Sequence, residues 1–139
     1  TLFRSRTGYL LKKTDLSENF SRTAIEKIDY KWSGYSFVLL SAYTEEEKDV
    51  DWQNLELNDL SLKLSEQSGT WITLFSVKDK QTILSKLNPA NFSIDELENF
   101  SIDFSGDEGF GTPIMDAIKT LHSALNRTDE EKIVLLEVA

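Results

Sequence analysis

The spacing of the apolar residues changes once along this 139-residue chain, near Val77. Before that point apolar and polar residues alternate, which is the period of a β-strand with one buried face. After it, apolar residues recur at every third or fourth position, which is the period of an amphipathic helix. We therefore expect strands in the N-terminal half, helices in the C-terminal half and an α+β fold, in which the two kinds of element form separate layers.

A first β-hairpin is predicted around Ser33-Gly34. Apolar residues alternate over residues 28–32 and again over residues 35–39, and glycine tolerates the positive φ angle that a two-residue turn requires. The residues before this hairpin, 17–29, also fit a helical spacing. Either a helix or a strand can therefore begin there.

A second hairpin is predicted in the middle of the chain. Leucine alternates with polar residues over 60–64, a turn at 66–69 ends in glycine, and residues 70–77 are rich in β-branched and aromatic side chains. The connection between the hairpins, 44–54, has no sustained period and is expected to be an exposed loop that carries Trp52. We expect the four strands to pair in one antiparallel sheet.

Three helices are predicted in the C-terminal half. The first covers residues 79–87 and ends at Asn88-Pro89. The second begins after Ser93, an N-cap residue with Glu96 at the capping-box position, and runs through Phe100. Both are short, so their stability must come from packing against the rest of the domain.

The third helix begins at Thr112-Pro113, because threonine is favoured at the N-cap and proline at the first helical position. Residues 132–138 then form a last strand that is buried on both faces. The sequence thus predicts a single α+β domain over residues 1–139, with a mostly antiparallel sheet of four to six strands and the helices of the C-terminal half packed on one face. The apolar face of the third helix comprises Ile114, Ile118, Leu121 and Leu125.

The charge of the chain restricts its partners. The formal net charge is −9, and between Lys86 and Lys119 there are seven carboxylates and no basic residue. Such a surface attracts cationic partners and repels nucleic acid and anionic membranes. The longest apolar runs have four residues, too few to span a bilayer. We expect a cytoplasmic protein that binds a protein partner and is a monomer before it does so.

The sequence contains no motif for catalysis or for a cofactor. There is no cysteine, and His122 is the only histidine; no catalytic sequence motif of serine, histidine and acid includes it. The glycine-rich segment 106–113 precedes a helix, as in anion-binding loops, but Asp107 and Glu108 would repel a phosphate. We therefore expect no enzyme activity and no cofactor.

A calcium or magnesium site in the same segment is an open alternative. A loop that starts at Asp103 has Glu108 where an EF-hand requires glycine and Ile114 where it requires a bidentate glutamate, so an EF-hand is excluded. A looser site made by Asp103, Asp107 and Glu108 would fit a metal-dependent hydrolase. A second alternative is an adaptor domain that mimics DNA.

The small size, the absence of cysteine, the strong acidity and the aromatic residues interspersed among the acids resemble the immunity proteins of bacterial toxin systems, including those of contact-dependent growth inhibition. This resemblance implies an inhibitor that binds a cognate toxin, often a basic nuclease, and covers its active site or blocks the substrate. Carboxylates would then take the place of phosphates on the toxin's cationic surface.

Two acidic segments carry the expected partner-binding surface. Both lie on predicted connections, where recognition residues concentrate. Interface anchors are commonly aromatic, and Tyr43, Trp52, Phe92, Phe100, Phe104 and Phe110 lie within or beside the acids. The predicted partner-binding residues are Glu45, Glu46, Glu47, Asp49, Asp51, Trp52, Asp103, Asp107, Glu108 and Phe110.

Overall fold

A computed structural model describes residues 5–12, 26–28 and 30–138. Within these ranges, one antiparallel sheet has the strand order β2-β1-β4-β3. The outer strand β3 is paired on one side only, with β4. The strands are β1 (Ser5–Lys12), β2 (Glu26–Ile28), β3 (Trp71–Phe75) and β4 (Lys132–Val138).

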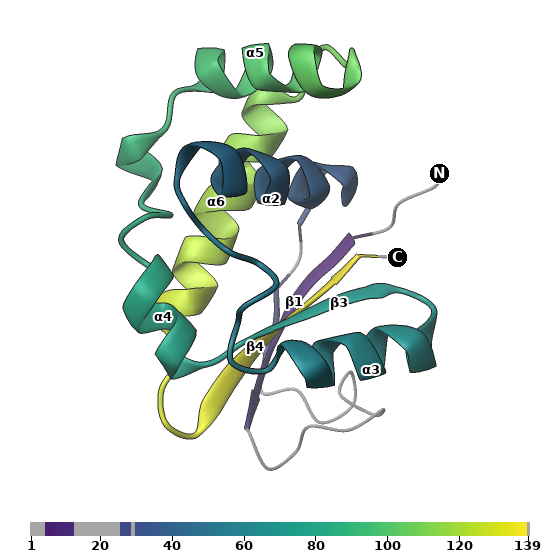
Figure 1. Ribbon diagram of the computed structural model, residues 1–139, viewed down its shortest axis with the longest axis vertical. Coiled ribbons are helices and arrows are strands. Elements are labelled where there is room, and N and C mark those ends of the chain that lie inside the picture. The colour runs from purple at the N-terminus through teal and green to yellow at the C-terminus, as the bar shows by residue number, and fades with distance from the viewer. Residues whose placement is uncertain (1–4, 13–25, 29, 139) are drawn as a thin grey trace.

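Helices cover both faces of this sheet (Figure 1). Helix α3 packs on one face, whereas α2 and α6 pack on the other; α5 lies across the N-terminal end of α6. A short 3₁₀-helix, η2 (Pro89–Asn91), precedes α5. The helices are α2 (Tyr35–Glu47), α3 (Asn58–Ser68), α4 (Val77–Ile83), α5 (Ile94–Ser105) and α6 (Gly111–Asn126).

Strand β4 separates two hydrophobic cores by simple alternation. On β4, Ile133 and Leu135 face α3, and Val134 and Leu136 face α2 and α6. Successive side chains of a strand point to opposite faces, so a strand that is apolar throughout must be covered twice. The prediction of a last strand buried on both faces is confirmed.

The predicted arrangement of the α+β fold is wrong. Residues 35–39 and 60–64, which were expected to be strands of two hairpins, lie in helices α2 and α3. The helices therefore come from both halves of the chain, and they cover both faces of the sheet instead of one. The predicted sheet of four to six strands built from those hairpins does not form. The choice between helix and strand over residues 17–29 falls largely outside the described residues.

Alternation in residues 35–39 was misleading because α2 is buried on more than one side. Phe37, Leu40 and Thr44 form one buried row at helical spacing, and Leu39 and Tyr43 form a second. Two adjacent rows on one helix also place apolar residues at every second position over a short stretch. Ser33-Gly34, the predicted turn, is instead the start of α2, with Gly34 at its N-cap.

In α3 the alternation of leucines had a different cause. Leu60 and Leu64, four residues apart, pack against the sheet, but Leu62 is 60% exposed. An exposed leucine between two buried ones imitates the period of a strand. Gly69 ends this helix in the left-handed conformation, which is the usual C-cap geometry for glycine.

The helices of the C-terminal half follow the predicted signals. The Ser93 hydroxyl accepts a hydrogen bond from the Glu96 amide at 3.1 Å, as expected of an N-cap, but α5 continues to Ser105. Helix α6 begins at Gly111 with Phe110 at its N-cap, so the prediction of Thr112 as N-cap is wrong, whereas the four apolar residues predicted for its face are buried. Helix α4 begins at Val77, two residues before the predicted start, with Ser76 as its N-cap.

Candidate functional site

The predicted partner-binding residues lie on four segments. Three glutamates, 45–47, occupy the last turn of α2 and are exposed. Residues 49–52 follow on the loop toward α3, Asp103 lies on α5, and residues 107–110 form the connection to α6. The structure brings only part of this set together.

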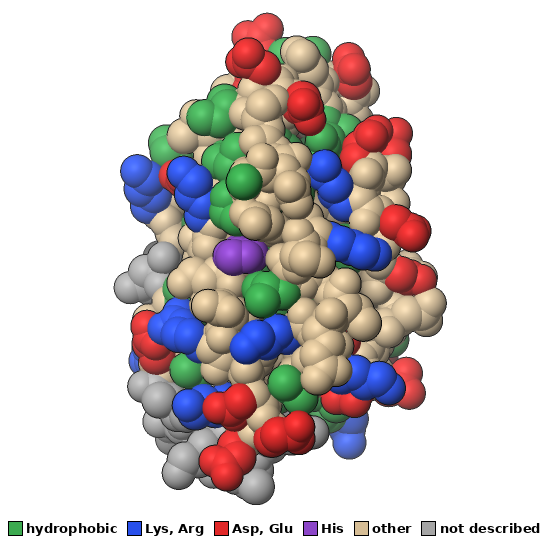
Figure 2. All heavy atoms as spheres, turned by 90° about the vertical axis from the view of Figure 1, so that its left-hand side faces the viewer, with side chains coloured by type: hydrophobic (Ala, Val, Ile, Leu, Met, Phe, Trp, Pro, Cys, Tyr) green, Lys and Arg blue, Asp and Glu red, His purple; other side chains and the backbone are tan. Residues whose placement is uncertain are grey.

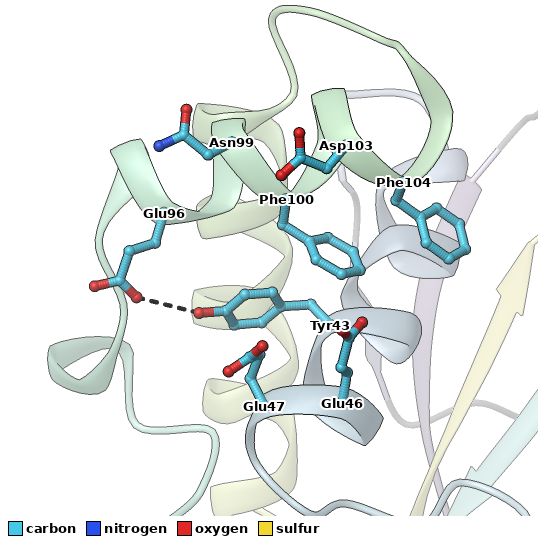
Figure 3. A pocket seen from close by; sticks show the side chains of 8 residues that line it. All are labelled: Tyr43, Glu46, Glu47, Glu96, Asn99, Phe100, Asp103 and Phe104. Atoms are coloured by element: carbon cyan, nitrogen blue, oxygen red, sulfur yellow. Dashed lines mark hydrogen bonds between the residues drawn. The ribbon is translucent and has the colours of Figure 1, made fainter.

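An open groove between α2 and α5 joins the two acidic segments (Figure 3). Its volume is about 520 Å³. Glu46 and Glu47 contribute from α2, and Asp103 contributes from α5. We call it the acidic groove; it is lined by Tyr43, Glu46, Glu47, Glu96, Asn99, Phe100, Asp103 and Phe104.

Helical spacing explains which side chains line the acidic groove. On α5, residues 96, 99, 100, 103 and 104 follow the spacing i, i+3, i+4, i+7 and i+8, which is one face of a helix. On α2, residues 43, 46 and 47 do the same. The acidic groove is therefore formed by two helix faces, not by the loops on which the sequence placed the partner-binding surface.

Aromatic rings form the apolar part of the acidic groove. The rings of Phe100 and Phe104 are stacked, with 5.3 Å between centroids and 20° between planes. Tyr43 meets Phe100 edge to face, at 5.0 Å. Phe104 is 53% exposed although it stacks on Phe100. Figure 3 shows both phenylalanine side chains projecting from α5, with the Phe100 ring next to Tyr43.

Tyr43 and Glu96 link the two walls. The Tyr43 hydroxyl donates a hydrogen bond to a Glu96 carboxylate oxygen at 3.1 Å (Figure 3). Burial raises the pKa of Tyr43 to about 12, and the hydrogen bond to Glu96 and the charges of Glu96 and Glu47 act in the same direction. Tyr43 is therefore a neutral donor at physiological pH and holds Glu96 in place.

The remaining carboxylates of the acidic groove are not neutralised. Within the described ranges, Glu46, Glu47 and Asp103 form no ion pair and no hydrogen bond; the ion pairs there join Arg127 to Glu26 and Lys132 to Asp129. The neighbouring Lys48 makes other contacts: its ammonium group donates a hydrogen bond to the Asn91 carbonyl and lies over the Phe92 ring. The field of the acidic groove is thus available to a cation from outside.

The glycine-rich connection before α6 is occupied by a side chain of the protein itself. The Glu98 carboxylate accepts hydrogen bonds from the Gly109 amide at 2.7 Å and the Gly111 amide at 2.8 Å. These two hydrogen bonds lower the pKa of Glu98, and the bond from the Gly109 amide has the larger effect. The two amides that could bind an anion in this connection already donate hydrogen bonds to Glu98.

The other predicted residues do not line the acidic groove. The Asp107 carboxylate accepts a hydrogen bond from the Ser105 hydroxyl at 2.8 Å, and Phe110 is half-buried against Tyr35. Glu108 and Asp49 are exposed, and Asp51 accepts hydrogen bonds within its own turn. Their contact with a partner stays a prediction.

Trp52 belongs to the core. Its indole N–H donates to the Thr44 hydroxyl at 2.8 Å, and its ring meets Phe75 edge to face at 5.5 Å. The side chain is only 7% exposed. The connection that carries it was expected to be an exposed loop, and the indole instead anchors that loop to α2 and β3.

Glu45 faces a second hollow, on the other side of the last turn of α2. This hollow has a volume of about 610 Å³ and is lined by α2, α3, β3 and the loop around Asn54. Because consecutive residues of a helix point in different directions, the three glutamates of one turn are divided between two hollows. The last turn of α2 is therefore an acidic ridge.

The described part of the chain contains no group of three or more His, Asp or Glu side chains that could hold a metal ion. The single histidine, His122, lies half-buried on α6, and Figure 2 shows Lys and Arg side chains on both sides of it. No described helix is long and apolar enough to cross a membrane.

The predicted partner-binding set contains three residues that line the acidic groove, Glu46, Glu47 and Asp103, and the aromatic residues noted among the acids add Tyr43, Phe100 and Phe104. Glu96 was assigned only to helix capping, and Asn99 was not considered. The signal was present, because extending the capped helix from Ser93 to Ser105 places both on the face that carries Asp103. Comparison with protein-family models, curated proteins and solved structures gives no match, so the function must be argued from the chemistry of the acidic groove.

Proposed function

We propose that this protein is an inhibitor that binds a cationic protein, in the manner of an immunity protein that neutralises a basic, nuclease-type toxin domain. The observation that carries the proposal is the acidic groove, which is lined by an exposed aromatic ring and by the carboxylates of Glu46, Glu47 and Asp103, none of which pairs with a cation among the described residues. The protein would act in the cytoplasm, as a monomer until it meets its partner.

The combination of charge and aromatic surface favours a protein as the ligand. Nucleic acid and anionic lipid are repelled by a chain with a net charge of −9. A protein partner can supply both a cationic group for Glu46, Glu47 and Asp103 and an apolar contact for Phe104. Aromatic anchors surrounded by charge are characteristic of binding hot spots and their rims.

Inhibition follows from the same chemistry. A nuclease holds the phosphates of its substrate with lysine and arginine side chains. Carboxylates on the ridge and in the acidic groove would pair with those side chains and exclude the substrate. Complementary fields also accelerate the encounter, by roughly 10- to 1,000-fold for strongly charged partners.

Coexpression with candidate basic, nuclease-type toxin domains tests the proposal. The parent chain is expected to restore growth and to co-elute with the toxin domain in gel filtration. The variant Glu46→Lys/Asp103→Lys reverses two charges of the acidic groove and should lose both properties. A matched control, Glu66→Lys/Glu130→Lys, reverses two exposed charges elsewhere and should keep them.

Thermal unfolding of both variants must stay close to that of the parent, because exposed substitutions usually change stability by no more than about 0.5 kcal/mol. If the groove variant protects cells as well as the parent does, the acidic groove is not the interface and the proposal is wrong.

A further inference from the structure

The acidic groove offers a cation two different kinds of contact. One is electrostatic, from the carboxylates of both helices; the other is the flat face of an aromatic ring. A ligand that uses both must be positively charged and planar. This combination distinguishes between the two cationic side chains that a partner protein can present.

The carboxylates approach from opposite sides. Figure 3 shows Glu46 and Glu47 on α2 across from Glu96 and Asp103 on α5. Tyr43 fixes one oxygen of Glu96, and the carboxylates of Glu46, Glu47 and Asp103 make no hydrogen bond within the described residues. A cation between the helices can therefore donate hydrogen bonds from more than one edge. A guanidinium group has five N–H donors in a fixed fork, which suits acceptors on several sides.

The aromatic wall favours the same group. Phe104 is stacked on Phe100 on one side and remains 53% exposed. A guanidinium is planar and weakly hydrated, so it can continue the stack on an aromatic face, whereas an ammonium is compact and strongly hydrated. The exposed ring beside unpaired carboxylates is thus better matched to arginine than to lysine.

We infer that the acidic groove is a receptor for an arginine side chain of the partner protein, with Phe104 as the stacking surface and Asp103, Glu46 and Glu47 as the acceptors. The inference rests on the proposed function, which it makes specific: the partner is held by arginine, and lysine at the same place binds more weakly.

Three capped pentapeptides test it, each with one central residue between glycines: arginine, lysine or citrulline, the neutral isostere of arginine. Binding is followed by NMR through the backbone amides of residues 43–47 and 94–105, up to peptide concentrations of tens of millimolar. The arginine peptide should bind about two- to five-fold more tightly than the lysine peptide, the factor expected of an exposed cation–π contact that the guanidinium makes and the strongly hydrated ammonium does not. The citrulline peptide should not bind.

Two variants separate the contributions. Phe104→Ala should reduce the affinity for the arginine peptide to that for the lysine peptide and leave the latter unchanged, whereas Asp103→Asn should weaken both. Ile102→Ala removes an exposed apolar side chain of the same helix that does not line the acidic groove, and should change neither. Circular dichroism confirms that each variant is folded.

Equal affinity for arginine and lysine peptides, binding of citrulline, or the absence of shifts in these amides would overturn the inference. The proposed function would survive those results if coexpression still gives protection that depends on Glu46 and Asp103. Conversely, if coexpression gives no protection while the arginine peptide still binds more tightly than the lysine peptide, the proposed function is wrong. The acidic groove would then remain an arginine-binding site.

Discussion

The side-chain hydroxyl of Ser61 on α3 accepts a hydrogen bond from the backbone amide of Leu74 on β3, at 3.0 Å. One turn later on the helix, the Ser65 hydroxyl accepts from the Ile72 amide at 2.9 Å and donates to its carbonyl at 3.2 Å. These backbone groups lie on the free edge of the outer strand. Helix α3 thus occupies an edge that another chain could otherwise extend.

Ser61→Ala should destabilise the protein by about 1–3 kcal/mol, because it leaves the buried Leu74 amide without an acceptor. Urea denaturation measures the free energy of unfolding. Ser123→Ala, the same change on an exposed position of α6, is the control and should change it by less than about 0.5 kcal/mol. Equal effects of the two substitutions would show that the edge contact contributes little.

Glu98→Gln should lower the thermal stability at neutral pH, since an amide cannot accept from both Gly109 and Gly111 as a carboxylate does. The pKa of Glu98 is lowered by folding, so its contribution is present above its ordinary pKa of 4.5 and is lost as the pH falls through the lower folded value. The difference in melting temperature between parent and variant should therefore shrink on acidification. Glu108→Gln, in the same connection, should show no such difference at any pH.

Gly111→Ala should lower the free energy of unfolding more than Gly106→Ala does. A Cβ at position 111 would lie 2.7 Å from the Ile94 carbonyl oxygen, so α5 and α6 would have to separate. Overpacking of this kind costs about 1–3 kcal/mol. At position 106 a Cβ meets nothing within 4 Å, and the cost of about 1 kcal/mol comes only from the positive φ angle of 75°. Unfolding free energies in the reverse order would contradict the close approach of the two helices.

Tyr43→Phe should make the protein less sensitive to alkali. The pKa of Tyr43 in the folded protein is about 12, above the ordinary value of 10.0. The stability contributed by the neutral hydroxyl is therefore complete below pH 10.0 and is lost as the pH rises toward 12. Unfolding free energies between these limits should fall less steeply in the variant than in the parent. Burial also raises the pKa of Tyr30, but Tyr30 is present in both proteins and cancels in the difference.

Association with the toxin domain should slow steeply as salt is added, because surface charges are screened over about 8 Å at physiological ionic strength. Stopped-flow measurements at low and high salt give the association rate. In Glu46→Lys/Asp103→Lys the salt dependence should be weaker, and in Glu66→Lys/Glu130→Lys, which alters net charge equally, the dependence should change less. A rate independent of salt in the parent would refute electrostatic steering.

Local signals in the sequence determined the C-terminal half of the protein. A serine cap, a run of residues at helical spacing and an apolar terminal segment are sufficient to predict α5, α6 and β4, because each of these signals acts within a few residues. The acidity of the surface also follows from the sequence, since charge is a sum over residues and does not depend on how they are arranged.

Only the tertiary structure decided the rest. Residues 35–39 and 60–64 alternate like strands, yet α2 and α3 form there because the neighbouring leucines and Tyr43 are buried by elements distant in the sequence. The acidic groove depends on the same long-range packing. Tyr43 and Glu96 are 53 positions apart and share a hydrogen bond only because α5 is held close to α6 at Gly111 and lies beside α2. Periodicity shows which face of a helix is polar, but the packing of the helices decides which polar faces meet.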